Sequence, residues 1–97
     1  MIASDCTTMA EVRAEIDRID AALVELLAER LTFIDRAAAL KTTLGLPARI
    51  DGRVEDVVAH VRAAAMARGV DPDLVDALWR RLIDWSIARE EQVLGKG

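Results

Sequence analysis

The fold of this chain is decided by residues 9–44, which read MAEVRAEIDRIDAALVELLAERLTFIDRAAALKTTL. Eleven positions in this stretch recur at spacings that alternate between three and four residues: Met9, Val12, Ile16, Ile19, Leu23, Leu26, Arg30, Phe33, Ala37, Leu40 and Leu44. Ten of them are apolar, so the pattern predicts a long helix whose seam packs against other helices. The exception is Arg30, and a guanidinium buried in such a seam is costly unless it is paired. Arg30 therefore indicates either a nearby acid or a pocket that receives an anion.

Residues near both ends of this stretch predict where the helix begins and ends. Thr8 and Glu11 have the spacing of a capping box, which predicts an N-terminus at Met9. Gly45 follows the last seam residue and Pro47 comes two residues later, the usual order at a helix C-terminus. Since no glycine or proline interrupts the stretch between, we expect one continuous helix.

Two further helices are predicted. One runs over residues 51–68 and ends at Gly69, and the other opens with Asp71 as N-cap and Pro72 at its first position. No strand alternation or repeat is present, so the expected fold is an all-α chain of three helices. The side chains expected to be buried are Ile50, Val54, Val57, Val58 and Val61 on the second helix, and Leu74, Val75, Leu78, Leu82, Trp85 and Val93 on the third.

Composition narrows the class of protein. The length of 97 residues predicts a single domain over residues 1–97, and 53% of them are hydrophobic. Cys6 is the only cysteine, so no internal disulfide is expected and a cytoplasmic location is favoured. A net charge of −4 argues against a nucleic-acid partner. We expect no signal peptide, because the N-terminus lacks a basic region followed by an apolar run. We also expect no membrane segment, because no apolar run approaches the necessary length of about 20 residues.

The length of the first helix predicts a homodimer. Residues 9–44 would span roughly 52 Å at about 1.5 Å per residue, whereas a compact chain of this size has a radius of gyration of only about 12–13 Å. The seam therefore needs a partner, and a second copy is the simplest. The alternative is a helix that breaks near residue 30 and folds back into a monomeric bundle.

Several cations surround the seam. Arg30 and Lys41 differ by only about 20° around the helix and lie roughly 16 Å apart along it. Arg13 lies about 25 Å from Arg30 along the same axis, so it could approach this face only from an antiparallel second copy. Arg53, at the start of the second helix, could add a fourth cation. Such a cluster suits a small dicarboxylate. The alternative is that Arg13 and Lys41 are solvated edge residues.

The third helix contributes Ser86 and Glu90, which lie on one helical face. Glu90 is either a salt-bridge partner of the cations or a protonated acid that donates a hydrogen bond, and both interpretations stay open. His60 has no acid, serine or cysteine at telling spacing and is expected at the surface. No metal-ligand cluster or phosphate-binding glycine loop is present, so no metal or cofactor is predicted.

Taken together, these residues resemble the all-helical class of chorismate mutases, and most of all the branch that includes isochorismate-pyruvate lyase. The resemblance runs from Asp5-Cys6-Thr7 to about Glu91. The segments that carry it are VRAEIDRID (12–20), LLAER (26–30), Lys41, residues 47–53 and LIDWSIAREE (82–91). It implies an intertwined homodimer of three-helix chains with two shared active sites, which converts chorismate to prephenate by a Claisen rearrangement without a cofactor.

The resemblance also implies roles for single residues. Arg13 matches an arginine donated by the partner subunit to a substrate carboxylate, and Arg30 matches the arginine that binds the other carboxylate in the same chain. Lys41 matches a lysine that contacts the ether oxygen and a carboxylate. Arg53 matches an arginine that also faces the carboxylates. Ser86 falls where some members contact the ring hydroxyl.

Two positions depart from the commonest mutase pattern. Many mutases carry glutamine where this chain has Glu90, although some carry glutamate there. Many also have an acid after the arginine that matches Arg53, and this chain has Val54, as in the lyase branch.

The function that the resemblance as a whole implies is chorismate mutase. Isochorismate-pyruvate lyase, which makes salicylate and pyruvate, is the alternative enzyme, and 4-amino-4-deoxychorismate is a third substrate to consider. A non-catalytic helical dimerisation module is the alternative of another class.

Overall fold

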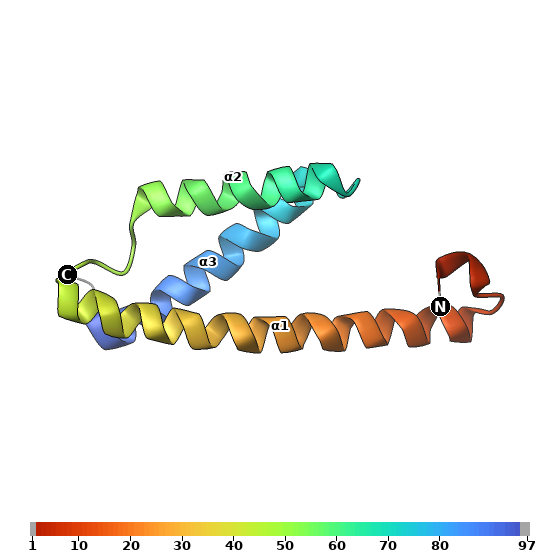
Figure 1. Cartoon of the computed structure of the whole chain (residues 1–97), viewed down its shortest axis with the longest axis horizontal. Coiled ribbons are helices and arrows are strands. Elements are labelled where there is room, and N and C mark those ends of the chain that lie inside the picture. The colour runs from red at the N-terminus through yellow and green to blue at the C-terminus, as the bar shows by residue number, and fades with distance from the viewer. Residues whose placement is uncertain (1, 96–97) are drawn as a thin grey trace. The chain divides into compact units, whose positions relative to one another are not determined.

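A computed structural model describes residues 2–95 as a short 3-10 helix, η1 (Ala3–Asp5), and three α-helices, α1 (Met9–Leu44), α2 (Asp51–Ala67) and α3 (Pro72–Leu94) (Figure 1). No strand occurs in this part of the chain. The prediction of an all-α chain with a long first helix is therefore confirmed, since α1 contains 36 residues. The second helix ends at Ala67, one residue earlier than predicted.

Side-chain and backbone hydrogen bonds fix both ends of α1. The backbone N–H of Glu11 donates to Oγ1 of Thr8 at 3.2 Å, as a capping box requires. The Glu11 carboxylate also accepts from the hydroxyl and the backbone N–H of Thr7 and from the hydroxyl of Thr8. At the other end Gly45 has a φ of +70°, and the N–H of Leu46 donates to the carbonyl of Lys41 at 3.0 Å. This is the Schellman pattern that ends many helices.

The chain divides into two compact units, Met1–Phe33 and Ile34–Gly97, with the boundary inside α1. In the first unit, η1 and the start of α1 enclose a small cavity of about 190 Å³ that includes Cys6 and Val12 in its lining. The apolar seam of this unit is largely exposed in the single chain. The exposed seam residues are Met9, Ile16, Ile19, Leu23, Leu26 and Phe33.

The second unit is built on the antiparallel pair of α2 and α3, which a turn at Gly69 connects (Figure 1). Its core is a small apolar cluster of Ala48, Val58, Ile83 and Ile87. Val54, Val57, Trp79 and Leu94 pack against this cluster, in agreement with the valines predicted on the buried face of the second helix. Ile50 was predicted on the same face but is 38% exposed, because it is the N-cap that precedes the first turn of α2. On the surface, Arg80 forms a bidentate pair with Glu55 across the two helices, at 3.0 and 3.1 Å.

The predicted buried face of α3 is wrong in part for this single chain, because only Val75 and Leu82 of its residues are half-buried. Leu74, Leu78, Trp85 and Val93 are each more than half exposed. The buried positions are instead Ile83, Ser86, Ile87 and Glu90. The reason is that α3 has two apolar faces, and only one of them packs against α2 and the loop that contains Ala48.

No helix among residues 2–95 has both the length and the apolar character needed to cross a lipid bilayer.

Candidate active site

The centre of the candidate site is a buried ion pair between α1 and α3. Nζ of Lys41 lies 2.8 Å from Oε1 of Glu90, and the two side chains are 18% and 5% exposed. Lys41 is in the last turn of α1, and Glu90 is on the buried face of α3. Of the two interpretations of Glu90 that the sequence left open, the salt-bridge partner is the arrangement seen in the structure.

A loop carbonyl completes the contacts of Lys41. Nζ of Lys41 donates a hydrogen bond of 2.8 Å to the carbonyl of Ala48. The Lys41 ammonium therefore forms an ion pair with Glu90, and its hydrogen bond is donated to the carbonyl of Ala48 in the loop. Oε1 of Glu90 is buried and has no donor in hydrogen-bond geometry among the described residues. A buried carboxylate oxygen in this position can accept a hydrogen bond from an additional donor.

Ser86 lies one turn before Glu90 on the same face of α3 and is 3% exposed. Its hydroxyl donates to the backbone carbonyl of Leu82 at 2.8 Å. This back-bonding fixes the side chain against its own helix. Ser86 is therefore a small, oriented polar group close in sequence to the ion pair.

The other predicted site residues differ in their exposure to solvent. Arg53 is exposed on the first turn of α2, and Val54 is half-buried against the apolar cluster. Arg13 and Arg30 belong to the first compact unit, where Arg13 is exposed and Arg30 half-buried. The structure thus brings together Lys41 and Glu90, while a shared site with the three arginines stays a prediction.

Two contacts beside the ion pair were not foreseen. The first is the carbonyl of Ala48, which has no residue-type signature because every residue carries a carbonyl. The second is a bidentate pair in which Arg89 donates to the two carboxylate oxygens of Asp35 at 2.7 and 3.0 Å. The hydrogen bond from Arg89 holds the pKa of Asp35 below its ordinary value. No local spacing links two residues that lie 54 positions apart.

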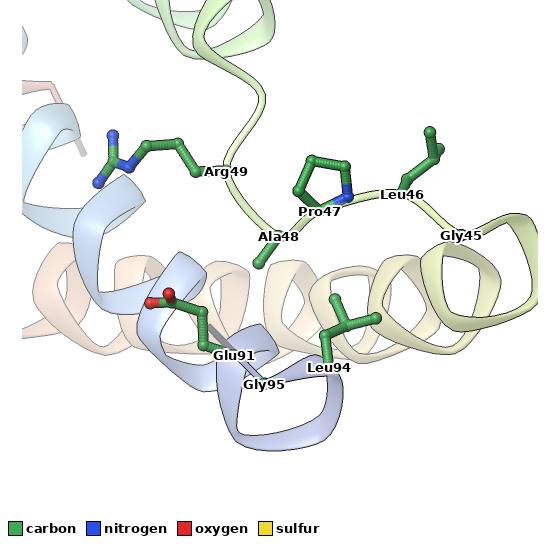
Figure 2. A pocket seen from close by; sticks show the side chains of 8 residues that line it. All are labelled: Gly45, Leu46, Pro47, Ala48, Arg49, Glu91, Leu94 and Gly95. Carbon is green, nitrogen blue, oxygen red and sulfur yellow. The ribbon is translucent and has the colours of Figure 1, made fainter. Parts of the chain in front are cut away.

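A cavity of about 550 Å³ lies next to this centre, between the loop after α1 and the end of α3. Figure 2 shows Pro47, Ala48 and Arg49 on the loop side and Glu91 and Leu94 on α3. Lys41 and Glu90 do not line this cavity, although Ala48 and Glu91 adjoin them. Within residues 2–95, no three His, Cys, Asp or Glu side chains are grouped to hold a metal ion.

Comparison with known proteins identifies relatives over most of the chain. The family described as chorismate mutase type II matches residues 12–91. The T-protein of Enterobacter agglomerans is 37% identical over 79 residues, which are 81% of this chain and 21% of that protein. The isochorismate pyruvate lyase of Pseudomonas aeruginosa is 32% identical over 87 residues, covering 89% of this chain and 84% of the lyase.

A chorismate mutase of Methanocaldococcus jannaschii is 29% identical over 86 residues, covering 89% of this chain and 87% of that enzyme. The chain spans about a fifth of the length of the T-protein and most of the length of the other two relatives. The resemblance read from the sequence is thereby confirmed.

Proposed function

Because the chain belongs to the type II chorismate mutase family, we propose that it catalyses the Claisen rearrangement of chorismate to prephenate. The observation that carries this proposal is the buried pair of Lys41 and Glu90, whose oxygen and nitrogen atoms lie 2.8 Å apart. These are the two positions that the family resemblance assigns to groups flanking the breaking ether bond. The rearrangement breaks one C–O bond and forms one C–C bond within a single molecule, so it requires no nucleophile, metal or cofactor.

In this proposal the substrate is a dicarboxylate held by arginines. Arg30 and Arg53 bind carboxylates from the same chain, and Arg13 is supplied by a second copy. Guanidinium groups suit this role because they bind carboxylates bidentately. Lys41 donates to the ether oxygen, where negative charge develops, and Ser86 lies toward the ring hydroxyl. Orienting a flexible diacid and stabilising developing charge are the two contributions that such a reaction requires.

The proposed enzyme is a homodimer with two shared sites. The exposed apolar seam of α1 supports this, because residues such as Leu26 and Phe33 are 60% and 67% exposed in the single chain. The second apolar face of α3, with Leu78 and Trp85, is exposed as well. Soluble monomers rarely leave extended apolar surfaces uncovered. A cytoplasmic location in aromatic amino-acid biosynthesis is part of the same proposal.

The role of Glu90 is decided by the pH dependence of the rate. A protonated Glu90 would donate a second hydrogen bond to the ether oxygen, so the rate would rise as pH falls below neutrality. Glu90→Gln would then remove this dependence, because the amide donates at every pH. A wild-type rate that is flat, or that rises from about pH 5 to about pH 8, would assign Glu90 instead as the carboxylate that holds Lys41.

Turnover of two substrates tests the proposed function. Purified protein is incubated separately with chorismate and with isochorismate, and the products are identified by chromatography. Prephenate from chorismate is the expected result. Salicylate and pyruvate from isochorismate, without prephenate, would assign the protein as a lyase instead. That second candidate is supported by the similarity to the Pseudomonas lyase and by Val54, which leaves no acid next to Arg53.

A non-catalytic dimerisation module predicts different results. It requires no turnover of either substrate and no heat signal on titration with a bicyclic diacid that mimics the transition state. It also requires that Arg30→Leu stabilise the dimer, because a charge in the seam would be replaced by apolar packing. Under the proposed function, Arg30→Leu abolishes binding of the diacid.

A further inference from the structure

We propose that Asp35 and Arg89 form a positioning clamp that holds Lys41 opposite Glu90; this inference rests on the proposed function. Neither residue is expected to touch substrate. Arg89 immediately precedes Glu90 on α3, and Asp35 lies six residues before Lys41 on α1. The clamp therefore joins the same two helices as the ion pair, at a distance of about 9 Å along α1.

The geometry of the clamp fixes an orientation as well as a distance. Nε of Arg89 donates to Oδ1 of Asp35 at 2.7 Å, and Nη2 donates to Oδ2 at 3.0 Å. Two parallel hydrogen bonds to one carboxylate restrict the guanidinium to one plane. The guanidinium carbon also lies 5.9 Å from the centre of the Trp85 ring, so a cation–π contact holds it from its own helix.

The composition of the apolar core explains why a clamp between α1 and α3 would matter. The cluster of buried and half-buried apolar residues in the second unit comes from α2, α3 and Ala48, and no described residue of α1 belongs to it. The last turns of α1 are joined to α3 by the two ion pairs instead. Ala38 lies between Asp35 and Lys41 on α1 and is 2% exposed. Its small side chain lets neighbouring residues of the second unit approach α1 closely. The register of Lys41 against Glu90 thus depends on these polar contacts together with the packing of Ala38.

An ordinary surface ion pair is the competing interpretation. The side chains of Arg89 and Asp35 are 40% and 51% exposed, and most exposed pairs contribute little to stability. The chain offers a matched control, because Arg80 and Glu55 form a second bidentate pair between helices at comparable exposure, 46% and 62%. That pair joins α2 to α3 and makes no contact with Lys41 or Glu90 among the described contacts.

The test compares Asp35→Asn with Glu55→Gln in the full chain, since each change removes one carboxylate charge with little change in shape. We expect Asp35→Asn to lower kcat about 10- to 100-fold, because misplacement of a reacting group by about 1 Å has effects of this size. KM should change less than about twofold, because the arginines that bind the substrate are untouched. Glu55→Gln should leave kcat and KM within about twofold of the wild type.

Two further variants separate an effect on the position of Lys41 from a failure of the chain to fold. Asp35→Glu keeps the carboxylate and should recover most of the lost kcat. Arg89→Lys keeps the charge but loses the planar fork, and it should lower kcat as Asp35→Asn does. If Asp35→Asn fails to fold, Arg89→Lys supplies the same comparison. Equal kcat in the wild type, Asp35→Asn and Arg89→Lys would overturn the proposal.

A measurement independent of turnover keeps the clamp testable if the proposed function fails. The ammonium protons of Lys41 are observed by ¹⁵N-resolved NMR, with Lys41→Met used to assign the signal. We expect slow exchange with water in the wild type and in Glu55→Gln, and fast exchange in Asp35→Asn. Unchanged exchange in Asp35→Asn would overturn the clamp even in a protein that converts neither substrate. Faster exchange in such a protein would support the clamp and reject only the proposed reaction.

Discussion

Removal of the Lys41 ammonium should destabilise the fold more than any other single change at this centre. In Lys41→Met, the Glu90 carboxylate stays 5% exposed and loses the cation that lies 2.8 Å away. At an effective dielectric constant of about 20, the attraction between unit charges at this separation is about 6 kcal/mol. Part of this is offset by the cost of burying both charges. Removal of one partner from a buried pair typically costs about 3–5 kcal/mol, which is the loss we expect here.

The reverse change should cost less. In Glu90→Gln, Lys41 keeps its 2.8 Å hydrogen bond to Ala48 and an 18% exposed side chain. We therefore expect a loss of about 1–3 kcal/mol, the range for one impaired buried polar contact. The double variant Lys41→Met/Glu90→Gln should lose less than the sum of the two single changes, because neither partner is left as a buried charge without its counter-ion. The double-mutant cycle thus predicts a strong coupling between the two sites.

Chemical denaturation provides the assay for these three variants. The free energy of unfolding is measured in urea at one fixed protomer concentration, because a dimer unfolds at a concentration-dependent midpoint. A loss of less than about 0.5 kcal/mol in Lys41→Met would refute the reasoning, since exposed substitutions have effects of that size. Additive effects of the two single changes would contradict it as well.

Three further predictions concern the scaffold. Ile83→Ala, at a 6% exposed core position, should lower the free energy of unfolding in urea by about 2–5 kcal/mol, and a loss below about 1 kcal/mol would contradict the assigned core. Gly45→Ala should cost about 1–2 kcal/mol, because Gly45 has a φ of +70° and open space around its Cβ position; a more stable variant would be contrary to this. The pKa of Asp76 is lowered chiefly by its hydrogen bond from Arg80, so this carboxylate stabilises the fold above about pH 4 and loses that contribution as pH falls through its lower folded pKa. Asp76→Asn should therefore flatten the fall of the melting temperature below about pH 4, and an unchanged acid limb would argue against this pair.

The bounds of the helices were predictable because their signals are local. Thr8 and Glu11 start α1 and Gly45 ends it, each through hydrogen bonds or dihedral angles within a few residues. Asp71 likewise accepts from the N–H of Asp73 at 2.9 Å and caps α3. These groups act within one turn, so their pattern in the sequence carries the necessary information.

The buried face of α3 was not predictable in the same way. Leu78 and Trp85 are as apolar as Ile83 and Ile87, and hydrophobic periodicity alone cannot say which stripe faces its own chain. The buried stripe also contains Ser86 and Glu90, which weaken its apolar signal. Both apolar faces of α3 are present in the sequence pattern, and only tertiary packing determines which of them is buried within the chain.

The candidate site was predicted in part. Lys41 and Glu90 were named from the sequence, and the structure places them in contact. Whether Glu90 paired with a cation or donated a hydrogen bond depended on its tertiary neighbours. The Ala48 carbonyl and the pair of Asp35 and Arg89 arise only when distant segments meet. Residue spacing cannot report such contacts.

The most direct measurement of the central claim is the rate of prephenate formation by the wild type and by Lys41→Met, each shown to be folded by circular dichroism. A donor aimed at developing negative charge is worth about 10²–10³-fold in kcat, so we predict a loss of that size in Lys41→Met. A variant that converts chorismate within about tenfold of the wild-type rate would contradict the role assigned to this lysine.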